Sequence, residues 1–196
     1  MKRVAVLISG RGSNLGSLID AADGSYKIIL VISNIEGAAG LERAEAAGIA
    51  TAVIPHAGKS REAFDAEMDA ALRAAHAEIV VLAGFMRILS DGFVRGWEGR
   101  LINIHPSLLP AYKGIGVHER VIEAGEKLSG ASVHFVVPEL DAGPVIAQAS
   151  MPVAPGDTPQ TLADRVLAVE HKLYPEALKL LAADKVKLQN GLAVFS

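Results

Sequence analysis

Short apolar runs alternate with alanine-rich helical segments through the first half of the chain, and this alternation constrains the fold more than any other feature. The runs are apolar at consecutive positions, which is typical of strands buried on both faces of a parallel sheet. Strands are expected at residues 4–8, 28–33, 51–54, 79–82 and 101–104, and helices at 13–22, 41–47 and 60–76. This order predicts right-handed crossovers and a doubly wound, mostly parallel α/β sheet, in one domain over residues 1–196.

The pattern changes after residue 128. Strands at 129–136 and 144–152 are joined by an acidic turn, and Thr158-Pro159 opens a long helix, with a cap residue followed by proline at the first helical position. Pro175 is expected to bend or interrupt this helix. Asn190-Gly191, between two short apolar runs, predicts a C-terminal hairpin.

Composition excludes several classes of protein. The chain has no cysteine, which rules out disulfides, thiolate nucleophiles and iron–sulfur clusters. Its net charge of −3, with both signs interleaved, gives no sign of nucleic-acid binding. No apolar run approaches the ~20 residues that span a bilayer, so we expect a cytoplasmic protein with no membrane partner. The six histidines fit no metal-binding motif, and no serine-hydrolase elbow occurs.

The first predicted strand runs directly into Gly10-Arg11-Gly12-Ser13-Asn14-Leu15 and then a helix. Glycines let a ligand approach the backbone, and a helix start presents unpaired N–H groups to an anion, which favours a phosphate cradle. The third position of a dinucleotide fingerprint is Leu15 instead of glycine, and no Walker lysine follows. The alternative is a tight turn in which Ser13 is a simple N-cap.

Polar side chains also follow two later strands. Asn103 and His105 lie two positions apart, so they point to the same face of the strand and could converge on one small electrophile. The loop 84–89 is apolar around Arg87, as suits a planar heterocycle, although its composition alone favours core packing beneath a loop. Asp141, on the acidic turn, could orient His105 and favour its charged form, whereas His134 is interpreted as a satisfied core histidine.

Together these motifs resemble the phosphoribosylglycinamide formyltransferase family. The resemblance rests on ISGRGSNL at 8–15, VLAGFMRIL at 81–89, NIHPSLLP at 103–110, and SVHF at 132–135 with Leu140-Asp141. It covers essentially the whole chain in order. It implies a Rossmann-like formyltransferase fold and transfer of a formyl group from 10-formyltetrahydrofolate to the amine of 5′-phosphoribosylglycinamide in purine biosynthesis, without a metal.

The resemblance also implies the site residues. The catalytic set falls on Asn103, His105 and Asp141. The residues that hold the ribotide fall on Gly12, Ser13, Asn14 and Glu170. The folate contacts fall on Arg61, Met86, Arg87, Ile88 and Leu89, on Asn103, and on Val137, Pro138, Glu139, Leu140 and Asp141. In this scheme the first half of the domain binds the ribotide phosphate, and the second half binds the folate and contains the catalytic residues.

Two departures from the family pattern stand out. Ala142 occupies a position where many relatives have glycine, and alanine is poorly compatible with a turn that requires positive φ there. Ile115-Gly116-Val117 precede His118, where relatives often have an earlier histidine. We expect both to tune the pockets rather than change the chemistry.

Other functions remain open from sequence. The nearest alternative is a formyltetrahydrofolate hydrolase, but hydrolases carry a regulatory domain before this one, whereas the first strand here is expected at residue 4. Methionyl-tRNA formyltransferases carry a further C-terminal domain, and we expect none here. A non-catalytic phosphosugar- or folate-binding module would not need the Asn103, His105 and Asp141 set. The sequence leaves a monomer and a homodimer equally open.

Overall fold

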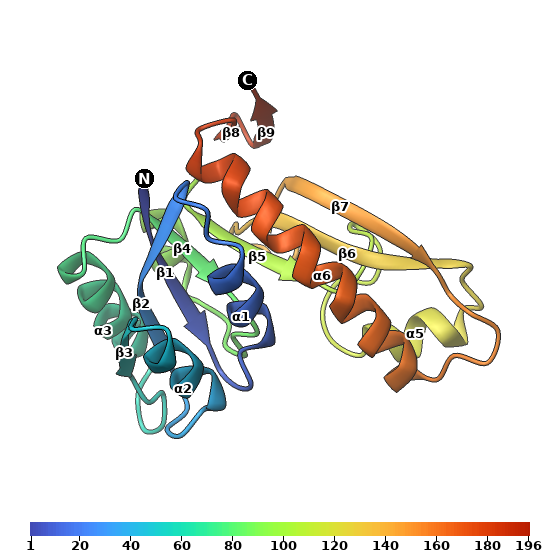
Figure 1. The fold of residues 1–196 in the computed structure, drawn as a ribbon, viewed down its shortest axis with the longest axis horizontal. Helices are drawn as coiled ribbons and strands as arrows, with labels where there is room; N and C mark the ends of the chain where they lie inside the picture. The colour runs from blue at the N-terminus through green and yellow to red at the C-terminus, as the bar shows by residue number, and fades with distance from the viewer.

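The structure, a computed structural model, describes all 196 residues and contains one seven-stranded sheet with strand order β3-β2-β1-β4-β5-β6-β7 (Figure 1). The strands are β1 (Lys2–Ile8), β2 (Tyr26–Ser33), β3 (Ala50–Val53), β4 (Ile79–Leu82), β5 (Leu101–His105), β6 (Leu128–Phe135) and β7 (Val145–Pro152). The helices are α1 (Ser13–Asp20), α2 (Ala39–Ala46), α3 (Arg61–Ala74), α4 (Asp91–Gly96), α5 (Val117–Glu123) and α6 (Pro159–Ala182). A separate hairpin of β8 (Val186–Gln189) and β9 (Leu192–Phe195) follows α6.

The order of the strands determines where a ligand can bind. β1 to β5 are parallel to one another, and β6 and β7 add an antiparallel edge beside β5. The chain builds outward from β1 to β3, then returns to β4 on the other side of β1. The carboxyl ends of β1 and β4 therefore flank a topological switch point, the position where open α/β sheets form a binding crevice. The predicted doubly wound fold is confirmed.

Helices cover both faces of the sheet and bury two apolar clusters. The larger includes residues of α1, α2, α5 and α6, and the smaller includes residues of α3 and α4. α6 crosses the sheet (Figure 1). The hydroxyl of its buried Tyr174 donates to the carbonyl oxygens of Leu82 (2.7 Å) and Ile102 (3.2 Å), which fixes α6 against β4 and β5. Pro175 does not interrupt α6, which continues past it to Ala182.

Two helices lack a clear sequence signal. α4 and α5 have six and seven residues, which is too short for an apolar stripe to repeat at helical spacing. The predicted hairpin is present, and Asn190 (φ 51°) and Gly191 (φ 74°) both adopt the positive φ that a type I′ turn requires. None of the helices is both long and apolar enough to cross a membrane.

Candidate active site

Asn103 and His105 project from the end of β5, and the antiparallel neighbour β6 places His134 directly beside Asn103. His105 and His134 are buried, with 6% and 2% of their surface exposed. The Asn103 Nδ2 lies 3.5 Å from His134 Nε2. Polar groups buried this deeply need partners, and these side chains find them in one another and in the turn that follows β6.

That turn contributes Asp141. Its Oδ2 accepts a hydrogen bond from the Gly114 amide (2.9 Å) and lies 3.5 Å from His105 Nδ1, while Oδ1 lies 3.8 Å from His134 Nε2. The structure therefore brings Asn103, His105 and Asp141, the three residues that the family pattern identified, together with His134. We call these four residues the Asn–His–Asp cluster; Asn103 is half-buried and the other three are buried. The other ring nitrogen of His105, Nε2, lies 2.8 Å from the Tyr112 carbonyl oxygen.

The conformation of the turn explains why alanine is acceptable at position 142. The residue with left-handed backbone is Asp141 itself (φ 49°), and Ala142 is not among the residues with positive φ. Aspartate is one of the few non-glycine residues that adopt this conformation readily. Gly143, in contrast, has no substitute, because a Cβ there would lie 1.7 Å from the Phe135 carbonyl oxygen.

His134 belongs to the site, which the sequence interpretation did not foresee. Its Nδ1 donates to the Phe135 carbonyl oxygen (2.9 Å), so Nε2 presents a lone pair toward Asn103. Burial lowers the pKa of His134, more than the Phe135 hydrogen bond and the nearby Asp141 charge raise it. The ring is thus a neutral acceptor that orients the Asn103 amide. No local sequence signal reveals this role, because it depends on the antiparallel pairing of β5 with β6.

At the carboxyl end of β1, the predicted phosphate loop leads into α1. Gly12 is the N-cap, with φ 69°, and no side chain caps the helix start. The alternative in which Ser13 is the N-cap is therefore wrong. A Cβ on Gly12 would lie 2.6 Å from the Gly40 Cα, so this glycine is required by packing against α2. The first N–H groups of α1 remain available to an anion.

Asn14 and Glu170 connect this loop to α6. The Asn14 Nδ2 donates to Glu170 Oε2 (2.9 Å), and the Asn14 Oδ1 is buried without a partner. Burial raises the pKa of Glu170, and the Asn14 hydrogen bond lowers it by less. An unpaired buried acceptor beside a buried carboxyl group is costly to the fold. Such a pair suits a ligand that brings N–H or O–H donors.

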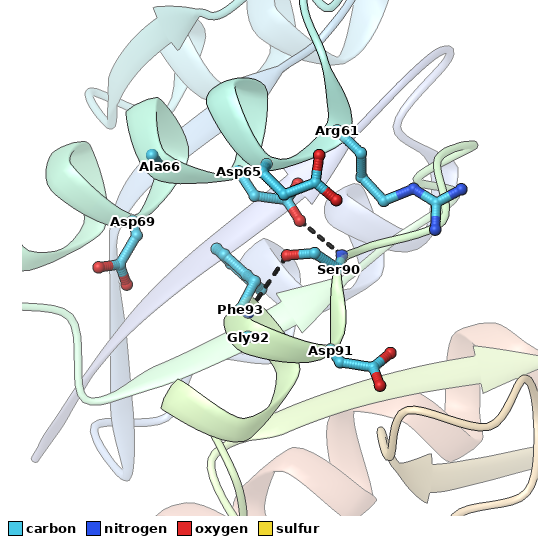
Figure 2. A pocket seen from close by; sticks show the side chains of 9 residues that line it. Arg61, Asp65, Ala66, Asp69, Ser90, Asp91, Gly92 and Phe93 are labelled. Atoms are coloured by element: carbon cyan, nitrogen blue, oxygen red, sulfur yellow. Dashed lines mark hydrogen bonds between the residues drawn. The ribbon is translucent and has the colours of Figure 1, made fainter.

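An apolar hollow adjoins the Asn–His–Asp cluster. Its lining residues are Leu82, Phe85, Arg87, Ile88, Leu89, Val94, Asn103, His134, Val136, Val137, Pro138, Glu139, Leu140 and Asp141. All but two of the residues expected to contact the folate therefore line this hollow. The two that do not line it are Met86 and Arg61. Met86 is 78% exposed, and Arg61 lines a different hollow, between α3 and α4 (Figure 2). No group of three or more metal-binding side chains is placed to hold an ion.

The fold is an open α/β sheet of the class that binds ligands at the carboxyl ends of its strands, and the cluster and the hollow lie at that edge. The model of the formyl transferase family matches residues 2–178, and the chain belongs to this family. Within it, the chain is 47% identical over 194 residues to phosphoribosylglycinamide formyltransferase of Escherichia coli, an alignment that covers 97% of this chain and 92% of the relative. The resemblance drawn from the motifs is confirmed.

Two further relatives extend the comparison. A crystal structure of glycinamide ribonucleotide transformylase 1 from Symbiobacterium toebii superposes with a TM-score of 0.95 at 40% identity, covering 100% of this chain and 94% of that one. The bovine trifunctional purine biosynthetic protein adenosine-3 is 52% identical over 194 residues. That alignment covers 96% of this chain but only 19% of the bovine protein.

Proposed function

We propose that this protein transfers the formyl group of 10-formyltetrahydrofolate to the amine of 5′-phosphoribosylglycinamide. The observation that carries the proposal is the position of the Asn–His–Asp cluster. Three of its members line the apolar hollow, which suits a pterin ring, and the uncapped start of α1, which suits a phosphate, follows β1 at the same carboxyl-end edge of the parallel strands. A formyl donor in the hollow and a ribotide on the loop would meet at this cluster.

The cluster has the groups that this reaction needs. Attack of a neutral amine on a formyl carbon builds negative charge on the formyl oxygen and positive charge on the nitrogen. Asn103 has an amide N–H to offer to the oxygen, since its contact with His134 at 3.5 Å occupies at most one of its two hydrogens. Both ring nitrogens of His105 face an acceptor: Nδ1 faces Asp141, and Nε2 faces the Tyr112 carbonyl oxygen. A doubly protonated ring would donate to both. If the formyl oxygen replaced one of these acceptors, His105 would be a second donor to the oxyanion.

Asp141 is the group placed to accept the proton that the attacking amine loses. Its two carboxylate oxygens lie beside two different imidazoles, at 3.5 Å from His105 and 3.8 Å from His134. It can stabilise a charged His105 while the oxyanion exists and then accept the proton that the attacking amine loses, directly or through a water molecule. As the oxyanion collapses, the bond between the formyl carbon and N10 of the folate breaks, and that proton passes to N10, which releases tetrahydrofolate. This sequence of steps needs no metal ion: every charge that develops meets a group of the cluster.

The substrates occupy opposite sides of the cluster in this proposal. The ribotide phosphate binds the N–H groups of Gly12, Ser13 and Asn14 and the hydroxyl of Ser13. The glycinamide and ribose donors of the ribotide meet Asn14 Oδ1 and Glu170. The pterin ring of the folate lies in the hollow between the loop 84–89 and the turn 137–141.

Absorbance spectroscopy with 10-formyltetrahydrofolate tests the proposal, because loss of the formyl group changes the folate spectrum. We expect turnover only when phosphoribosylglycinamide is added, with stoichiometric formation of the formylated ribotide by mass spectrometry. Equal turnover without the ribotide, releasing formate, would instead identify a formyltetrahydrofolate hydrolase. Binding of either ligand without turnover would identify a binding module.

A further inference from the structure

The loop at residues 84–89, here called the cleft loop, forms one wall of the apolar hollow but has little packing of its own. Met86 is 78% exposed and Ile88 is 59% exposed. A loop with so few buried contacts has low local stability unless something outside it fixes its conformation. In this structure the fixing points are two side chains, the half-buried Ser9 at one end and the buried Asp65 at the other, neither of which lines the hollow.

Ser9 holds the first end. Its Oγ accepts a hydrogen bond from the Met86 amide (2.8 Å) and donates to Asn34 Oδ1 (2.5 Å). Asn34 is only 4% exposed, and its Nδ2 lies 3.1 Å from His56 Nδ1. With Nδ2 directed to the imidazole, Oδ1 is directed to Ser9. The Ser9 hydroxyl hydrogen is thereby committed to Asn34, which leaves its lone pair for the Met86 amide.

Asp65 holds the second end. This α3 residue is 3% exposed, and its Oδ2 accepts a hydrogen bond from the amide of Ser90 (2.6 Å), the N-cap of α4 (Figure 2). The neighbouring Phe64 stacks on Phe85 of the cleft loop, with ring centroids 6.3 Å apart and an interplanar angle of 8°. Consecutive residues of α3 thus fix the loop from its start and from its end.

We propose that Ser9 and Asp65 are positioning residues that hold the cleft loop in the conformation that binds the formyl donor. The inference rests on the proposed function, since it assumes that the hollow takes the pterin ring. Its physical basis is that apparent affinity falls in proportion to the fraction of molecules with a binding-competent loop. A purely structural role predicts something else, namely lower stability with unchanged affinity in the molecules that remain folded.

Ser9→Ala tests the first end, and Ser33→Ala is its matched control. Ser33 is fully buried at the end of the adjacent strand β2, and its hydroxyl also makes two hydrogen bonds, both with the backbone of Ile35. Loss of one neutral hydrogen bond changes an equilibrium by roughly 2- to 13-fold. We therefore expect Ser9→Ala to weaken binding of the stable analogue 10-formyl-5,8-dideazafolate by about 3- to 10-fold, and Ser33→Ala to leave it unchanged.

Asp65 offers a rescue experiment. Asp65→Ala removes the acceptor of the Ser90 amide, whereas Asp65→Asn keeps one. We expect Asp65→Ala to raise the KM for the formyl donor by a similar factor, with kcat and the ribotide affinity within about twofold of the parent, and Asp65→Asn to restore the KM. Amide hydrogen exchange should quicken at Met86 in Ser9→Ala and at Ser90 in Asp65→Ala, but at neither amide in Ser33→Ala.

The results separate this inference from the proposed function. If the parent protein does not bind the folate analogue, the proposed function fails. If the parent binds it and folded Ser9→Ala binds it equally well, the positioning role of Ser9 is wrong while the function stands. If Asp65→Ala fails to fold, the folate affinity and the amide exchange rates of Ser9→Ala still test the role of Ser9. A raised KM for the formyl donor in Asp65→Asn would overturn the role of Asp65.

Discussion

The most direct test of the chemistry is Asp141→Asn. The substitution preserves the shape of the side chain, keeps an oxygen to accept the Gly114 amide, and introduces a residue that also tolerates the left-handed backbone at φ 49°. What it removes is the negative charge 3.5 Å from His105. At an effective dielectric constant of about 20, two unit charges at that separation attract with on the order of 5 kcal/mol.

This magnitude sets the expected loss of activity. If Asp141 stabilises the imidazolium only while charge develops, up to that much transition-state stabilisation is lost, which at about 1.36 kcal/mol per tenfold corresponds to at most about four orders of magnitude. Positioned acid–base groups usually contribute about 10²–10⁴, so we expect kcat to fall within that range. The assay is steady-state formyl transfer with both substrates saturating, together with the ribotide Kd by calorimetry, which should change little.

Asp157→Asn is the matched control. The Asp157 side chain is 8% exposed, against 6% for Asp141, and its carboxylate likewise accepts a backbone amide, that of Ala154 (2.8 Å), beside a cationic partner, Arg165. It lies outside the crevice residues described above, so it should lose stability but retain kcat. Near-parental kcat in folded Asp141→Asn would refute the reasoning and direct attention to His134 as the partner of His105.

Three more predictions follow from the site. Ser13→Ala should weaken phosphoribosylglycinamide binding by roughly 1.5–3 kcal/mol, the value of a hydrogen bond to a charged group; calorimetry showing unchanged ribotide affinity would remove this hydroxyl from the phosphate site. Ile88→Asp should leave stability nearly unchanged, because Ile88 is already 59% exposed, yet lose more than about 2 kcal/mol of folate binding, because the bound ring would bury an unpaired carboxylate; normal folate affinity would place the pterin elsewhere. Burial raises the pKa of Glu170, so the fold opposes its ionisation, and stability is lost as the pH rises through the folded-state pKa. Glu170→Gln cannot ionise, so in urea unfolding from pH 5 to 8 its stability advantage over the parent should grow with pH, and an advantage that shrinks with rising pH would contradict the assignment.

Those parts of the fold that depend on local periodicity could be predicted from the sequence. Runs apolar on both faces identified β1, β2, β4 and β5, and the glycine loop after β1 identified the start of α1, because both signals arise from neighbouring residues. The two-residue spacing of Asn103 and His105 also sufficed to put them on one face of β5. The family motifs then grouped Asp141 with them, although nothing in the local pattern required it.

Only the tertiary structure decided how these groups meet. His134 joins the site because β6 pairs antiparallel with β5, a register that no local pattern of the sequence specifies. Position 12 requires glycine because the backbone of Gly40, far away in the sequence, packs against it, and not only because a ligand approaches. The left-handed residue of the acidic turn is Asp141 and not Ala142. Contacts between residues far apart in the chain depend on the packing of whole elements, and for that reason local sequence signals predict the elements of this protein better than the geometry of its site.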